Sequence, residues 1–103
     1  MASGILGQSN PTASTNTTVY TVPSAKTASC TVNICNAGGS GAIVTLSVAA
    51  TGTPAASEYI LYNMTLPAYG AIEKSGLVIN ATKNVVVNTT GSSVAVAVYG
   101  FEE

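Results

Sequence analysis

Short runs of β-branched and aromatic residues, separated by turn residues, constrain the fold of this chain more than any other feature. The runs are rich in Val, Ile, Thr and Tyr, and turn sequences such as "AGGSG" at 37–41 and "TGTP" at 51–54 close them. Short strands at intervals of about 8–12 residues are typical of sandwiches and barrels. The runs that we predict as strands are 17–22, 28–36, 42–50, 59–66, 71–74, 77–80, 84–89 and 93–101. We therefore predict an all-β protein, an antiparallel β-sandwich of jelly-roll or immunoglobulin-like type with about eight short strands.

The chain of 103 residues is short enough to form one domain. Residues 14–103 hold the predicted strands, and a single helical turn is expected near 54–57. Residues 1–13 lack alternation, so we predict an N-terminal arm there that contacts a neighbouring subunit through Ile5, Leu6 and Gln8. The first ten residues lack the basic segment followed by an apolar segment that is typical of a secretion signal. We therefore expect the chain to be made in a cytoplasm.

Alternation of side chains with period two assigns the two faces of each predicted strand. In 28–36 it places Cys30, Val32 and Ile34 in the core. In 59–66 it places Ile60, Tyr62, Met64 and Leu66 on one face. In the last run it turns three valines inward and leaves an apolar outer set, Ala95, Ala97, Tyr99 and Phe101. Because that outer set is not polar, we expect a partner to cover it.

Cys30 and Cys35 lie on one predicted strand, five residues apart. At ~3.3 Å per residue, their Cα atoms are roughly 16 Å apart, which exceeds the ~7 Å limit for a disulfide. Alternation also turns them to opposite faces. We therefore predict that neither cysteine forms an intrachain disulfide and that Cys30 is a small core residue.

The charge content excludes several classes of function. Only seven residues are charged, three lysines and four glutamates, and the net charge is −1; typical domains are about one quarter charged. Nucleic-acid binding needs a basic patch, and the longest apolar runs are too short to cross a membrane. The chain has no His and no cluster of metal ligands. We predict a protein that is not an enzyme, has no cofactor or metal, and binds neither nucleic acid nor membrane.

Aromatic side chains are the remaining candidates for a binding surface, because they offer a large contact area at a low cost in conformational entropy. We predict that Tyr20 and Tyr62 lie at the edge of the core, with their hydroxyls in water. Tyr59, Tyr69, Tyr99 and Phe101 are instead candidates for a partner interface. Four Asn-x-Ser/Thr sequences also occur, at Asn16, Asn63, Asn80 and Asn88; they are expected by chance in a chain so rich in Asn and Thr.

Several segments resemble a family of small structural proteins of tailed-phage particles. The residues that carry the resemblance are Leu6-Gly7-Gln8, Thr17-Thr18-Val19-Tyr20-Thr21-Val22-Pro23 and the pair Cys35-Asn36, followed by "EYILYNMTLPAYG" (58–70), "SGLVINATKNVVV" (75–87) and the terminal "YGFEE". Relatives often carry a basic residue after the Cys-Asn pair, where this chain has Ala37. The resemblance implies a β-sandwich component of the virion without enzymatic activity.

We therefore expect a capsid decoration or cement protein, made in the host cytoplasm and located in the virion. Its expected partners are the major capsid protein or other virion proteins, and further copies of itself in a homo-oligomer. A surface of small, weakly charged residues is inexpensive to cover, because the burial of ions is the costly part of desolvation. The alternative is a tail or fibre component that contacts host surface glycans through its loops and tyrosines.

Overall fold

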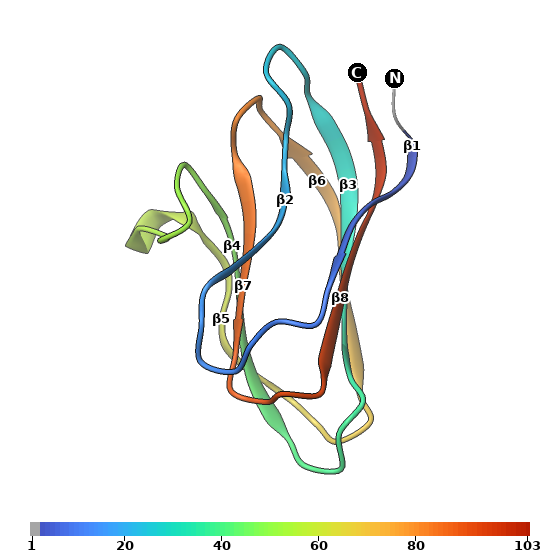
Figure 1. The fold of residues 1–103 in the computed structure, drawn as a ribbon, viewed down its shortest axis with the longest axis vertical. Helices are drawn as coiled ribbons and strands as arrows, with labels where there is room; N and C mark the ends of the chain where they lie inside the picture. The colour runs from blue at the N-terminus through green and yellow to red at the C-terminus, as the bar shows by residue number, and fades with distance from the viewer. Residues whose placement is uncertain (1–2) are drawn as a thin grey trace.

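Two four-stranded antiparallel sheets pack face to face in the computed structural model, which describes residues 3–103 (Figure 1). The strands are β1 (Ser3–Ser9), β2 (Thr17–Thr21), β3 (Ala28–Asn36), β4 (Ala42–Ala49), β5 (Tyr59–Leu66), β6 (Ala71–Ile79), β7 (Asn84–Thr89) and β8 (Val94–Glu102). Sheet A has the strand order β1-β8-β3-β6, and sheet B has the order β2-β7-β4-β5. A 3₁₀ turn, η1 (Ala56–Glu58), precedes β5. The prediction of an all-β antiparallel sandwich is confirmed.

The pairing of the strands is that of one long hairpin rolled into a sandwich. β1 pairs with β8, β2 with β7, β3 with β6 and β4 with β5, so the two halves of the chain run antiparallel along their whole length. The pairs β3–β8 and β4–β7 then join these ribbons into two sheets. This connectivity is a jelly roll; an immunoglobulin domain distributes its strands differently between the sheets.

The core is formed by the inward side chains of both sheets. β3 alternates strictly, with Cys30, Val32 and Ile34 buried. β4 and β8 add Val44 and Leu46, and Val94, Val96 and Val98. The inward positions predicted for the runs 28–36 and 93–101 are therefore confirmed, and β-branched residues fill most of the space between the sheets, as their preference for pleated surfaces favours.

Asn36, which is buried at the end of β3, connects the loops at one end of the sandwich. Its Nδ2 donates to the carbonyl oxygens of Ser40 at 2.8 Å and Pro67 at 3.2 Å, while its Oδ1 accepts from the Gly38 backbone N–H at 3.0 Å. A buried amide that lost these partners would carry a desolvation penalty. Asn36 therefore has a structural role in this chain.

β1 corrects the prediction of an N-terminal arm. From Ser3 to Ser9 this segment is an edge strand that pairs with β8 of its own chain, with an irregularity in register between Ile5 and Gly7. An edge strand needs a hydrogen-bonding partner on one side only, and a bulge interrupts alternation, so the segment lacks the usual sequence pattern of a strand. Residues 1 and 2 of the predicted arm lie outside the described residues.

β5 and β6 also differ from the prediction. The runs 71–74 and 77–80 form one continuous strand, β6, in which Gly76 has φ +75°. In β5 the register shifts twice: Tyr62 and Asn63 together oppose Thr45, and Ile60 is extra between Tyr59 and Leu61. These bulges place Leu61 against the core and expose Ile60 and Tyr62, while Met64 and Leu66 keep regular register with Val44 and Ala42. The four side chains predicted on one face are therefore divided, and only Leu66 among them is buried.

Candidate functional site

Sheet A presents an outer face with several exposed apolar side chains, which we call the sheet A face. Its apolar members are Ile5, Val78, Ala95, Ala97, Tyr99 and Phe101. Register places Ile5 beside Tyr99, and it places Ser29 of β3 between Phe101 and Val78, so the apolar side chains come from β1, β8 and β6, with β3 between β8 and β6. Val78 is 70% exposed, Ile5 58% and Phe101 40%. Contiguous exposed apolar side chains on a soluble domain are typical of interaction sites.

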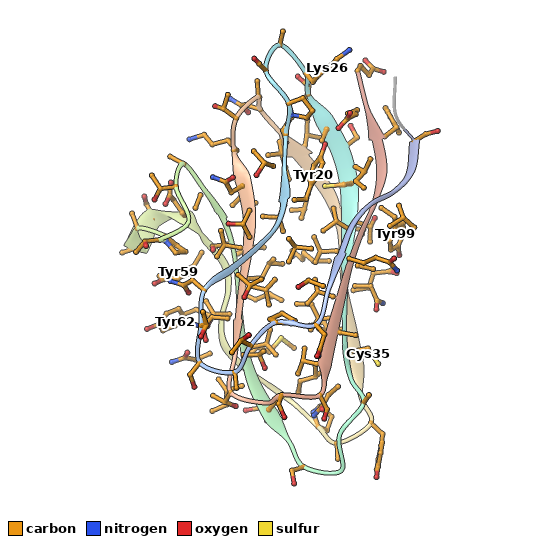
Figure 2. All side chains as sticks on the ribbon, viewed as in Figure 1. Tyr20, Lys26, Cys35, Tyr59, Tyr62 and Tyr99 are labelled. Carbon is orange, nitrogen blue, oxygen red and sulfur yellow. The ribbon has the colours of Figure 1, made fainter. Side chains whose placement is uncertain are left out.

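Tyr99 occupies the middle of the sheet A face, on the outer side of the sheet (Figure 2). Its hydroxyl donates a hydrogen bond to Glu73 Oε2 on β6, across the intervening strand β3. This bond raises the pKa of Tyr99 above its ordinary value, with smaller contributions from desolvation and from the charge of Glu73. The contact fixes the tyrosine ring and gives the Glu73 carboxylate a partner within the face.

Two shallow hollows of about 350 Å³ and 310 Å³ lie in this face. The first lies near Gln8, Asn33, Cys35 and Ala95, and the second lies between Thr31, Val78, Tyr99 and Phe101. The first hollow has a mixed lining of amide and small side chains, the second has a mainly apolar lining, and neither contains an acid–base pair. These hollows can receive protruding side chains from a partner.

The structure brings most of the predicted interface residues together. Ala95, Ala97, Tyr99, Phe101, Ile5 and Gln8 all lie on β8 and β1, and Gln8 pairs with Ala97. Leu6 instead packs against the core, because the bulge in β1 turns it inward. Tyr69 is exposed on the turn between β5 and β6, and Tyr59 lies on the opposite face, in sheet B.

Both cysteines are free, as predicted, and the burial pattern of β3 turns them to opposite sides of sheet A. Burial raises the pKa of the Cys30 thiol, which keeps it protonated and unreactive. Cys35 is partly exposed beside Ala95 on the sheet A face. The geometry therefore places Cys35 at the candidate interface, a position for which its sequence neighbours give no signal.

The outer face of sheet B carries a second feature, a cleft of about 290 Å³ centred on Thr45. Asn88 on β7 lies beside Thr45 in register, and Tyr62 and Asn63 oppose Thr45 from β5. Asn16 and Tyr59 complete the cleft together with Thr53 and Pro54, which form a wall from the loop before η1. Figure 2 shows Tyr59 and Tyr62 on the outer side of sheet B, opposite Tyr99.

Sequence reasoning missed this cleft. It placed Tyr62 at the edge of the core, whereas the ring is 63% exposed because the bulge turns it outward. The sequence pattern gave no binding role to Asn16, Asn63 and Asn88, which stood out only as members of Asn-x-Ser/Thr sequences. A usable signal was the presence of Asn within or beside strands, where this residue is otherwise depleted.

The described residues contain few groups for chemistry. Within 3–103, no three His, Cys, Asp or Glu side chains lie close enough together to hold a metal ion. Among the same residues, no helix has the length and apolar character needed to cross a membrane. The Tyr20 hydroxyl, predicted to lie in water, instead donates a hydrogen bond to Glu102 Oε2 between the sheets, which corrects that prediction.

The chain matches no model of a known protein family, no curated protein and no solved structure in the comparisons made with it.

Proposed function

We propose that this protein is a non-enzymatic structural protein of a tailed-phage virion, and that it decorates and stabilises the capsid. The observation that carries the proposal is the sheet A face, where exposed apolar side chains from β1, β6 and β8 lie together. The sequence resemblance to small phage virion proteins points in the same direction. The proposed partners are the major capsid protein and other copies of this chain.

The proposed mechanism is passive. A protein that binds only the assembled shell stabilises it by mass action. The sheet A face suits this role because its apolar side chains gain free energy when they leave water, at roughly 25 cal/mol per Å². Its central carboxylate, Glu73, already accepts a hydrogen bond from Tyr99, which reduces the cost of covering it.

The sandwich architecture supports a rigid contact surface. β8, which carries most of the sheet A face, is held between β1 and β3, so both of its edges are hydrogen-bonded. A preorganised surface loses little conformational entropy when it docks.

Quantitative mass spectrometry of purified phage particles that encode this chain tests the proposal. A decoration protein is expected at a fixed ratio to the major capsid protein. A copy number that matches the tail proteins instead would contradict the decoration role and favour the tail or fibre alternative.

A pair of matched variants tests the face itself. Phe101→Asp is expected to lower the copy number on particles at least tenfold, because docking would bury an unpaired carboxylate. Ile43→Asp is the control, since Ile43 is 43% exposed, close to the 40% of Phe101, but lies on the outer face of sheet B. Equal loss of incorporation in the two variants would refute the assignment to sheet A.

A further inference from the structure

The cleft on the outer face of sheet B combines an aromatic half with a polar half. Tyr59 and Tyr62 form the aromatic half, and Asn16, Thr45, Asn63 and Asn88 form the polar half. Its volume of about 290 Å³ is near the lower end of ligand sites, which run from about 300 to 1,000 Å³. The cleft is therefore large enough for a small polar ligand.

The two tyrosine rings pack against each other and remain open to solvent. Their centroids are 4.6 Å apart, and their planes are tilted by 56°. Tyr62 is held outward by the bulge at Asn63, whose φ of +48° is tolerated by Asn more readily than by most residues. The bulge thus presents an aromatic surface to solvent, and this surface contributes little to the packing of the core.

The polar half contains amide groups held by their neighbours. Asn88 Nδ2 donates to Asn16 Oδ1 at 2.9 Å, and the Asn63 backbone N–H donates to Thr45 Oγ1 at 3.1 Å. An Asn side chain has two N–H donors and a carbonyl acceptor, so each of these amides retains hydrogen-bonding capacity beyond the contacts above. The side chains lining the cleft are all uncharged.

We propose that this cleft binds a neutral carbohydrate, a mono- or disaccharide unit of a surface glycan. One side of a sugar ring is formed by C–H groups that pack against an aromatic face, while its hydroxyls both donate and accept hydrogen bonds, as amides do. A charged ligand would lack a counter-ion here, because no Lys or Glu lines the cleft. An extended peptide would instead use the unpaired edge of a strand, whereas this cleft lies on the face of the sheet.

The wall of the cleft is organised before any ligand arrives. Glu58 Oε1 accepts from the Ala55 backbone N–H at 2.7 Å, and Glu58 Oε2 accepts from the Ala50 backbone N–H at 3.1 Å. These two bonds tie together both ends of the loop that carries Thr53 and Pro54. A preformed site loses less conformational entropy on binding.

The inference goes beyond the proposed capsid role and does not rest on it. The cleft and the sheet A face lie on opposite sides of the sandwich (Figure 2). A subunit docked through sheet A therefore leaves the cleft turned outward. Binding can be tested on the isolated protein, so a failure here is distinguishable from a failure of the capsid assignment.

Titration of the isotope-labelled protein with neutral saccharides, followed by NMR, tests the proposal. The probes are glucose, galactose, mannose, rhamnose, N-acetylglucosamine and disaccharides of these sugars, at millimolar concentrations. At least one saccharide is expected to shift the amide signals of Asn16, Thr45, Asn63 and Asn88. Shifts confined to other surfaces, or no shifts with any probe, would overturn the assignment.

Three tyrosine variants identify the role of the aromatic half. Tyr62→Ala is expected to weaken binding of the responsive saccharide about tenfold, through loss of ring contact. Tyr62→Trp is expected to retain binding, because the aromatic surface is kept. Tyr69→Ala is the control, since Tyr69 is an exposed tyrosine outside the cleft. Unchanged affinity in Tyr62→Ala, or an equal loss in Tyr69→Ala, would refute the site; thermal melts of all three confirm folding.

Discussion

Tyr20 and Glu102 connect the two sheets through a single hydrogen bond near the end of β8. Tyr20, on β2 in sheet B, is 9% exposed, and its hydroxyl donates to Glu102 Oε2 on β8 in sheet A. Burial is the largest cause that raises the pKa of Tyr20 well above its ordinary value, followed by the hydrogen bond to Glu102 and by its charge. The protonated hydroxyl is therefore part of the folded structure.

Tyr20→Phe is expected to lower the free energy of unfolding at pH 7 by about 1–2 kcal/mol, because a hydrogen bond to a charged group is lost. Glu102→Gln retains an acceptor and should cost less. Urea unfolding at pH 7, followed by circular dichroism, measures both changes. Equal stability of Tyr20→Phe and the wild type would contradict a stabilising role for this bond.

The same pair predicts the direction of alkaline destabilisation. Above pH 10 an unfolded tyrosine ionises while Tyr20 in the folded protein stays protonated, so the unfolded state binds fewer protons and stability falls as pH rises. Below pH 10 the stabilisation is fully present. The stability gap between the wild type and Tyr20→Phe should therefore narrow between pH 10 and 11, by about 1 kcal/mol. A constant gap across this range would contradict the raised pKa.

At the scale of elements, β8 depends on a close approach to β3 at Gly100. Gly100 has φ +148°, and a Cβ built there would lie 2.1 Å from the Ser29 carbonyl oxygen. Its partner in β1, Gly4, also has a positive φ, +99°, but a Cβ there meets no atom within 4 Å. Substitution of Gly4 therefore tests the cost of the positive φ alone, whereas substitution of Gly100 tests the positive φ together with a steric clash.

Gly100→Ala is expected to lower the free energy of unfolding by about 3 kcal/mol or more, because β8 and β3 must move apart as well as accept a strained φ. Gly4→Ala should cost only about 1 kcal/mol, for strain alone. Thermal and urea melts of the two variants compare them directly. Similar losses in both would show that the contact with Ser29 relaxes at little cost.

The bounds of most strands were predictable from sequence. The edge strand β1, and the faces of β5, were not. β3, β5 and β7 have the predicted bounds, β2 and β4 each end one residue earlier than predicted, and β8 begins and ends one residue later. β1 was missed because an edge strand with a bulge shows no alternation. The cleft on sheet B was missed for the same reason. Period-two alternation assigns faces correctly only where the register is unbroken, and the bulge at Tyr62 and Asn63 in β5 breaks the register.

At the scale of the whole molecule, the pairing order could not be predicted from local pattern. Turn signals identify neighbours in sequence, but the jelly roll pairs β1 with β8, which lie at opposite ends of the chain. The sheet A face depends on that pairing, since it brings Ile5 beside Tyr99. The apolar outer side of β8 was predictable, whereas its extension over β1 and β6 required the fold.

The sandwich separates its two candidate surfaces by the thickness of two sheets, which pack about 10 Å apart. Substitutions at sites that distant, without shared partners, act independently to within about 0.3–0.5 kcal/mol. Tyr62→Ala is therefore expected to weaken saccharide binding by particles about tenfold without lowering the copy number of the protein on them. Phe101→Asp is expected to lower the copy number and leave the saccharide affinity of the free protein unchanged. The double variant should show both losses and no additional one. Mass spectrometry of particles and NMR titration of free protein measure the two readouts separately, and a loss of incorporation in Tyr62→Ala would mean that the cleft itself faces the capsid.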